Sequence, residues 1–360
     1  MANILKGIDK IVTTSNTEVD LENIQASGSG GTVSAAGLAI TREEDSDSID
    51  YSFNVGGNTH EADGHSSTAD SAYAMNGAGS SGPYFTTGEK MSFADYNATA
   101  TLINGLTSTH AAPAANINNN AYMFGGYGSG SHLQSIEKVQ LSDDAVSQVS
   151  SSLQNSVHGS NTANDGSIAL TMGGHNTNSD YRNFVQKLNG SDESVDTAYS
   201  SLSQSAGYFS TGSNGSDVLI MAGKRNNSNA EVSTVTKMSI SAGGTDAPFG
   251  QLTSGYHGWG GCSNASTAFC YQGIGNQGIY AHKFDDNSTQ VQFGTMTWAK
   301  YYSAQSGNGE LGIAMGGWDT NATRNVDLFS QTDGSSFSSP GALSGSGHRH
   351  WCGGVSGTSA

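Results

Sequence analysis

Three histidines at a regular spacing are the side chains of this sequence best placed to do chemistry together. His110, His158 and His257 each stand 16 residues before a glycine of a repeated motif, and Tyr208 and Tyr301 take a similar place in other units. Imidazoles that ring a channel could bind a ligand together or respond to pH near neutrality. Because Tyr and His interchange here, we favour the interpretation that each ring packs or hydrogen-bonds within its own unit.

An acidic segment near the N-terminus is the second candidate. Asp45, Asp47 and Asp50 have the alternating spacing that a calcium-binding loop can use. The turn glycine and the bidentate Glu of an EF-hand are missing, so we predict a solvated acidic loop and no metal. Its charge favours contact with a basic partner surface. The residues predicted to make that contact are Arg42, Glu43, Glu44, Asp45, Asp47 and Asp50.

Local catalytic motifs are missing, since the sequence contains no GxSxG, HExxH or P-loop. A carboxylate pair for glycoside hydrolysis comes from distant segments and leaves no local pattern, so that alternative stays open. The sequence predicts a protein that is not an enzyme and binds no cofactor.

The elements that must position these side chains are short strands. The 360 residues include 49 glycines and only 4 prolines, which suits many strands joined by tight turns and argues against long helices. Six apolar segments end in glycines 44 to 50 residues apart, a period typical of four-stranded propeller blades. These repeat glycines are Gly77, Gly126, Gly174, Gly223, Gly273 and Gly317. The methionines just before four of them are predicted to be buried: Met123, Met172, Met221 and Met315.

A second marker sets the expected number of blades. Lys90, Lys138, Lys187 and Lys237 each precede a repeat glycine by 36 residues. A similar triplet ending at Lys10, together with two weaker cases, brings the markers to seven. We therefore expect an all-β propeller of about seven four-stranded blades. A count of six is the alternative, because the stretch from Lys10 to Lys90 is about 30 residues too long for one period.

The two ends of the chain are expected to close the ring. His350 stands where a blade begins, but the glycine that should follow it would lie beyond Ala360. Pairing of residues 349–355 with residues near Ile8 would complete that blade and remove exposed strand edges. The sequence thus predicts a single propeller domain over residues 1–360, with polar insertions at about 42–69 in the first blades.

The order of strand, glycine pair, loop and further strands resembles kelch repeats over nearly the whole chain. It departs from them because Trp259, Trp298, Trp318 and Trp351 are not periodic. The segment IEKVQLSDD at residues 136–144, within Ser- and Asn-rich repeats, is similar to kelch-like structural proteins of tailed phages of cyanobacterial and marine hosts.

This resemblance implies a non-enzymatic virion protein, an accessory or decoration of the tail, baseplate or capsid. Its partners would be other virion proteins and, at the host surface, glycans; it would reach the virion after synthesis in the host cytoplasm. A lectin-like, carbohydrate-binding propeller is the alternative. The kelch-like family also includes galactose-oxidase-like copper enzymes, with which Cys270, Tyr271 and His257 invite comparison. We do not favour that activity, because Cys270 falls in an expected core strand and no spacing supplies the ligand set.

Charge and the termini exclude several other classes of partner. The net charge of −17 repels nucleic acid and anionic lipid surfaces. Without an apolar run for a secretory signal or a membrane span, we expect neither secretion by that route nor membrane insertion. Cys262, Cys270 and Cys352 are an odd number without CxxC spacing, and we expect them to be small buried side chains.

Overall fold

The computed structural model divides the chain into two compact units, Met1–Thr59 and His60–Ala360. The residues that it describes are 10–12, 18–20, 33–35, 38–45, 48–55, 69–79, 84–107, 109–156, 158–176, 180–225, 230–255, 257, 260–271, 273, 275–290, 292–318, 322–344, 350 and 352–357. Secondary structure in these ranges is strand and turn, and they contain no helix that is long and apolar enough to cross a membrane.

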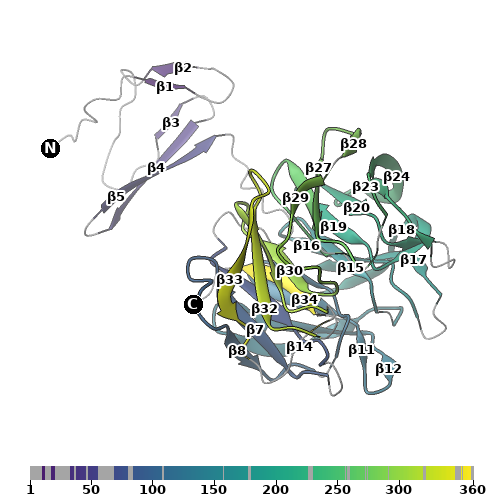
Figure 1. The fold of residues 1–360 in the computed structure, drawn as a ribbon. Coiled ribbons are helices and arrows are strands. Elements are labelled where there is room, and N and C mark those ends of the chain that lie inside the picture. The colour runs from purple at the N-terminus through teal and green to yellow at the C-terminus, as the bar shows by residue number, and fades with distance from the viewer. Residues whose placement is uncertain are drawn as a thin grey trace. The chain divides into compact units, whose positions relative to one another are not determined.

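Six antiparallel sheets in the described part of the second unit form the blades of a ring (Figure 1). From the axis outward, blade 1 contains β34 (Gly353–Gly357), β6 (Ser71–Met75), β7 (Thr87–Ser92) and β8 (Thr101–Asn104). Blade 2 contains β9 (Ala114–Ile117), β10 (Asn120–Phe124), β13 (Ser135–Gln140) and β14 (Ala145–Ser152). Blade 3 contains β15 (Asn161–Asn164), β16 (Ile168–Met172), β17 (Arg182–Asn189) and β18 (Val195–Gly207).

The remaining three blades follow in chain order. Blade 4 contains β19 (Ser210–Ser213), β20 (Asp217–Met221), β23 (Thr234–Ser239) and β24 (Gly243–Leu252). Blade 5 contains β25 (Gly260–Ser263), β26 (Thr267–Tyr271), β27 (Gly278–Lys283) and β29 (Gln292–Thr295). Blade 6 contains β30 (Ala304–Gly307), β31 (Leu311–Met315), β32 (Asn325–Ser330) and β33 (Ser336–Ala342). Short strands β21 (Lys224–Arg225) and β22 (Ala230–Glu231) extend blade 3, and β28 (Thr289–Gln290) extends blade 4.

The ring is closed by the C-terminal strand, which is the innermost strand of blade 1. β34 pairs with β6 in antiparallel register, with Gly353 opposite Met75 and Gly357 opposite Ser71. The inner strands contact one another in sequence from β9 through β15, β19, β25 and β30 to β34, which contacts β9 again. Closure by the C-terminal segment is confirmed, but the expected pairing with residues near Ile8 is wrong, because β6 takes that place.

The first unit explains why the count is six and not seven. Its described strands are β1 (Lys10–Val12), β2 (Glu18–Asp20), β3 (Val33–Ala35), β4 (Leu38–Asp45) and β5 (Ser48–Val55). β1 pairs with β2, and β3, β4 and β5 form a second small sheet, so the marker at Lys10 belongs to no blade. The propeller expected over residues 1–360 takes its blades from residues 71–357.

The acidic segment is not the surface loop that the sequence suggested. Glu43 in β4 lies opposite Asp50 in β5, within a hairpin of two eight-residue strands. Asp47 and residues 56–68 lie outside the described residues. Ile49, Tyr51 and Phe53 alternate with polar or charged residues, which is the pattern of a β-strand. The run of acidic residues before them obscured this pattern in the sequence.

The hydrophobic core lies between neighbouring blades, where the faces of successive sheets meet. Met123, Met172, Met221 and Met315 are at most 2% exposed, as predicted. Closer to the axis the inner strands consist mostly of small residues. A Cβ atom on Gly212 in β19 would lie 2.6 Å from Ala268 Cβ in β26 of the next blade, so a larger residue at position 212 would not fit there.

Polar side chains join neighbouring blades at the repeat period. Thr211 Oγ1 donates to Thr162 O (2.6 Å) and Ser263 Oγ to Ser213 O (2.7 Å), across 49 and 50 residues of sequence. Further out, Lys138 Nζ lies 2.6 Å from Glu193 Oε1 in the next blade. Lys90 makes the same kind of contact with Asp144, 2.8 Å away in blade 2. Lys237 also reaches the next blade, where Nζ donates to Phe284 O, whereas Lys187 Nζ lies over the Tyr199 ring of its own blade. Three of the four periodic lysines therefore link blades.

Candidate binding site at the channel mouth

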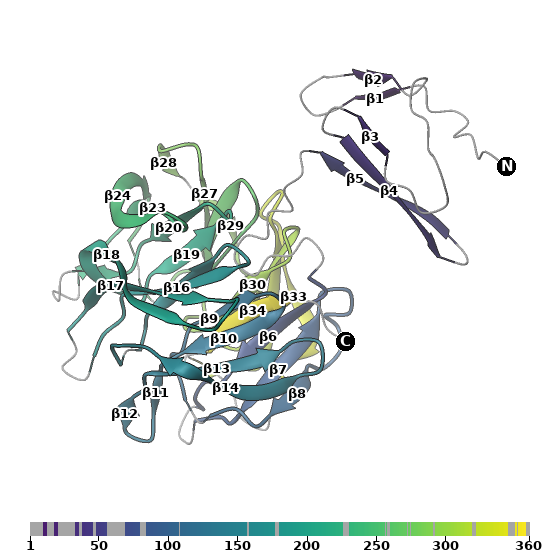
Figure 2. The same cartoon turned by 180° about the vertical axis from the view of Figure 1, so that it is seen from behind.

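The connections between strands divide the ring into two faces. Because neighbouring strands are antiparallel, successive connections leave a blade at alternate ends. In blades 2 to 6 the hairpin face carries the turns from the inner strand to the second strand. The loop face carries the connections from second to third strand and from each outer strand to the next inner strand. The recurring His and Tyr positions fall on the loop face, as does the hairpin of β11 (Tyr127–Gly128) and β12 (Ser131–His132), labelled in Figures 1 and 2.

The repeat glycines bring two of these connections together. The residue after the glycine forms a bridge with the His or Tyr marker, as in His158 with His175 and Tyr301 with Trp318. Gly174 has a φ of 88°, and a Cβ atom there would lie 2.9 Å from His158 O. A positive φ is also found at Gly77, Gly126, Gly223 and Gly317. Glycine suits these positions, because an L side chain would strain both the backbone and the bridge.

Four histidines from blades 2 and 3 form a cluster on the loop face. The ring centroids of His158 and His175 lie 3.6 Å apart, and those of His158 and His132 lie 4.4 Å apart. His110 lies farther out, at 6.4 Å from His158. Tyr208 Oη lies 3.3 Å from His158 Nε2 and hydrogen-bonds to His175 Nε2. With Tyr208, the cluster brings together five successive connections of the loop face.

The histidines of this cluster are uncharged at neutral pH. Burial, with the neighbouring His175, His132 and His110, lowers the pKa of His158 to about 2. Burial also lowers the pKa values of His110 and His175 to about 4. Neutral imidazole offers one donor and one acceptor nitrogen, so the cluster can hydrogen-bond or ligate without losing a proton.

Two details differ from the sequence interpretation. His110 and His158 contact each other across blades, so the idea that each ring packs within its own blade is wrong. Tyr208 is also not equivalent to His158. It corresponds to the residue after each marker, which is Gly159 in one blade and Tyr302 in another, and these two residues also have positive φ values, 62° and 57°. A Cβ atom on Gly159 would meet the ring of Tyr208, which explains why a glycine stands there.

His132 and His175 were missed by sequence reasoning, and His257 takes a different role. His175 directly follows Gly173-Gly174, which is a usable signal once the bridge is known. His132 comes from a hairpin inside a loop of variable length, so no repeat marks it. His257 hydrogen-bonds to Glu231, and its ring centroid lies 6.4 Å from that of Tyr208.

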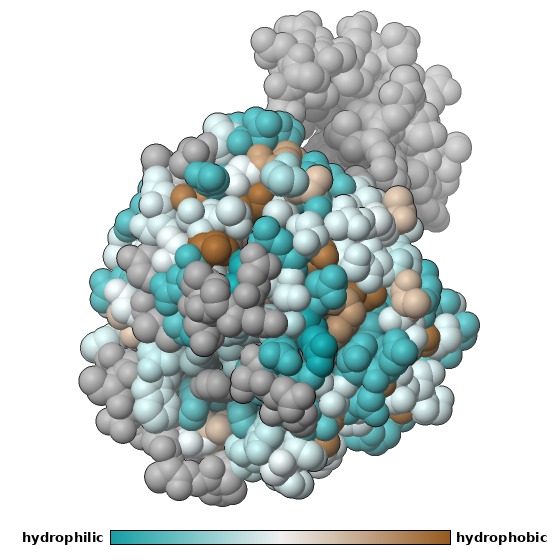
Figure 3. Space-filling model, turned by 90° about the vertical axis from the view of Figure 1, so that its right-hand side faces the viewer, coloured by the Kyte–Doolittle hydropathy of each residue, from teal (hydrophilic) through white to brown (hydrophobic). Residues whose placement is uncertain are grey.

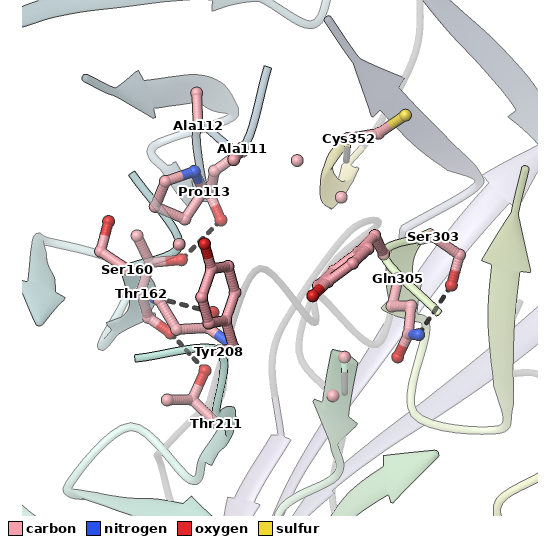
Figure 4. Close-up of a pocket in the computed structure, with 18 of the residues that line it drawn as sticks. Ala111, Ala112, Pro113, Ser160, Thr162, Tyr208, Thr211, Ser303, Gln305 and Cys352 are labelled. Atoms are coloured by element: carbon pink, nitrogen blue, oxygen red, sulfur yellow. Dashed lines mark hydrogen bonds between the residues drawn. The ribbon is translucent and has the colours of Figure 1, made fainter. Parts of the chain in front are cut away.

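A cavity of about 130 Å³ opens beside this cluster, between the inner strands (Figure 4). Figure 4 shows Tyr208 on one side and Gln305 on the other. Tyr208 and Tyr302 both line the cavity, with ring centroids 5.7 Å apart. Both have positive φ values, 54° and 57°, which cost about 1–2 kcal/mol each for an L residue. Strain of this kind tends to be kept at functional sites.

The lining is polar but uncharged. The described lining residues include no Asp, Glu, Lys, Arg or His. Ser160 Oγ, Gln305 Oε1 and Ser306 Oγ are buried and have no hydrogen-bond partner among the described residues. Burying such an atom without a partner costs about 1–3 kcal/mol, so each is a position where a ligand or water can bind.

The surface shown in Figure 3 is mainly hydrophilic or neutral, with small scattered apolar spots. Among the described residues only Leu102 and Trp298 are large apolar side chains that remain exposed. The described surface therefore carries no broad apolar patch of the kind that marks a permanent protein interface.

The other sequence candidates are accounted for separately. Cys270 and Tyr271 are fully buried in β26, and Tyr271 Oη donates to Ile313 O (3.0 Å) between blades 5 and 6. Cys262 is buried as well, whereas Cys352 is half-buried and lines the cavity. The predicted interaction residues Arg42, Glu43, Glu44, Asp45 and Asp50 lie in β4 and β5 of the first unit. Their role as a contact surface stays a prediction.

Comparison with known proteins identifies the fold. No family model and no curated protein matches the chain. The solved structure of YjhT superposes with a TM-score of 0.60 and 13% sequence identity, over 75% of this chain and 94% of that one. At this identity the likeness speaks for the fold alone. Together with the six blades in their closed ring, it shows that the chain has a kelch-like β-propeller fold.

Proposed function

We propose that this protein is a non-catalytic binding propeller, and that the cavity on its loop face takes a neutral, hydroxyl-rich ligand such as one sugar unit of a glycan. The observation that carries the proposal is the described lining, which is uncharged and contains three buried polar atoms with no partner. An ion would find no opposite charge there, whereas a sugar hydroxyl both donates and accepts hydrogen bonds.

The individual groups fit such a ligand. Gln305 Oε1 can accept from a hydroxyl, and Ser160 and Ser306 can donate to one or accept from one. The rings of Tyr208 and Tyr302 add apolar faces beside these groups. The volume is below the 300–1,000 Å³ or so of pockets for drug-sized ligands, which favours a single ring or a chain end.

The same lining argues against glycoside hydrolysis. That reaction needs two carboxyl groups about 5–9.5 Å apart on either side of the bond. The described lining residues contain no carboxylate. A binding role therefore accounts better for this cavity than a hydrolytic one.

The proposed role as a virion accessory rests on the resemblance of the repeat sequence to phage proteins. In that setting the cavity would face the host and the propeller would attach through other surfaces to virion proteins. Co-purification with intact particles at a fixed copy number would support this role. A protein that is missing from purified particles would be a free glycan-binding module instead.

The binding proposal is tested with a panel of neutral mono- and disaccharides and an array of immobilised glycans. Ser160→Ala removes one open hydroxyl and should weaken binding of the best ligand at least fivefold. Ser167→Ala is the matched control, because Ser167 lies on the hairpin face and bonds to Asp165. The proposal fails if no neutral saccharide binds, or if both variants bind like the wild type.

A further inference from the structure

Three histidines of the cluster converge in a way that the proposed ligand does not use. His132, His158 and His175 each offer a ring nitrogen, and these atoms all lie within 4.8 Å of one another. They come from three different connections: His132 from β12, His158 from the segment before β15, and His175 from the segment after β16. None of the three lines the cavity.

The donor set is selective. Imidazole nitrogens suit zinc, copper and nickel, whereas magnesium and calcium require oxygen ligands. Both ring nitrogens of His132 are shielded from solvent and have no hydrogen-bond partner among the described residues. A shielded nitrogen without a partner is costly, and a metal ion would relieve that cost.

We propose that His132, His158 and His175 form a binding site for a divalent cation of the zinc class on the loop face. Three histidines with an open fourth position are a known zinc arrangement. Tetrahedral bonds of about 2.0–2.1 Å place ligand nitrogens roughly 3.4 Å apart, so the ring nitrogens, now within 4.8 Å of one another, must draw together by at most about 1.4 Å. The Tyr208 hydroxyl lies against Nε2 of both His158 and His175.

The surroundings favour the cation. The net charge of −17 attracts a cation to the protein as a whole. Because Tyr208 also lines the cavity, a bound metal would hold one wall of the proposed ligand site. The metal site itself does not depend on that ligand.

The test is titration of the metal-free full-length protein with Zn²⁺ by calorimetry, and with Co²⁺ as a spectroscopic probe. We expect one ion per chain, a rise in melting temperature, and visible Co²⁺ absorption typical of four-coordinate geometry. His132→Ala should lower the affinity more than tenfold, and His132→Gln should behave alike, because neither side chain supplies an imidazole. His257→Ala is the matched control, since His257 lies on the same face outside the three.

Folding of each variant is checked by its melting temperature without metal. His132 is at the end of a short hairpin, so its replacement should leave the apo-protein folded. The site does not exist if wild-type protein fails to bind Zn²⁺ and Co²⁺ at micromolar concentration. Equal affinity of wild type, His132→Ala and His175→Ala would also overturn it, because the metal would then be bound elsewhere.

Discussion

The hairpin face and the loop face of the ring differ in how many of their side chains recur from blade to blade. On the hairpin face, Asp165, Asn214, Asn264 and Asn308 recur at the repeat period, and each Oδ1 accepts a backbone N–H three residues on at 2.8–2.9 Å. On the loop face the repeat glycines and the bridged His or Tyr positions also recur, but the side chains around them differ from blade to blade. The repeated residues on both faces serve the fold, and the residues that vary on the loop face supply the chemistry.

The loop face is itself uneven. Blades 2 and 3 supply His110, His132, His158 and His175, whereas the connections of blade 6 supply Tyr301 and Trp318 at the bridged positions. The imidazoles of the loop face are thus concentrated at blades 2 and 3, whereas a single imidazole, His350, packs against Trp318. The proposed binding site is therefore asymmetric.

The largest effect should come from the core that both faces share. Met172 is fully buried in β16. Met172→Asp loses about 1.5–3 kcal/mol of burial and also buries a carboxyl group, so we expect a loss of at least ~4 kcal/mol and poor folding. Met172→Leu should cost less than about 1.5 kcal/mol. Urea denaturation measures both, and wild-type stability of the Asp variant would show that the repeat has been misaligned.

The next largest effect should come from a turn of the hairpin face. Asn264 Oδ1 accepts from Thr267 N at 2.9 Å and from Ser266 N at 3.1 Å. Asn264→Ala removes both bonds, and we expect a loss of about 1–2 kcal/mol. Asn264→Asp keeps the acceptor and serves as the control. If Ala and Asp variants unfold at the same urea concentration, the turn contributes nothing through this side chain.

A smaller effect should appear with pH at the closing blade. Burial lowers the pKa of His350 to about 4 from its usual value near 6.5. The folded state therefore binds fewer protons between pH 4 and 6.5, and stability is lost as the pH falls through that range. His350→Tyr uses the residue found at the equivalent position 301, and it removes the titration. Between pH 7 and pH 5 we expect the free energy of unfolding of His350→Tyr to fall by about 1 kcal/mol less than that of the wild type. The difference is this small because the partial exposure of His350 weakens the effect of its pKa shift.

The comparison of faces also explains what the sequence could predict. Gly174 was recognisable because a positive φ and a close backbone contact suit only glycine. Met172 was recognisable because an apolar residue recurs before that glycine. Both belong to the repeated part, where one blade predicts the next.

The remaining features depend on single connections. His132 enters from a hairpin that is particular to blade 2, and the cavity depends on six inner strands meeting at the axis. The seventh blade was expected because a short strand at Lys10 resembles the marker, while the three-dimensional pairing of β34 with β6 leaves no place for it. Spacing along the chain could not reveal these long-range contacts.

Calorimetric titration of the best neutral saccharide tests the central claim most directly. It should be done on the wild type, on Gln305→Leu, which removes the open acceptor in the cavity, and on Asn264→Ala. We predict at least a tenfold loss of affinity for Gln305→Leu and unchanged affinity for Asn264→Ala, even though the latter is the less stable protein. Equal affinity of all three, or a loss confined to the hairpin-face variant, would contradict the assignment of binding to the loop face.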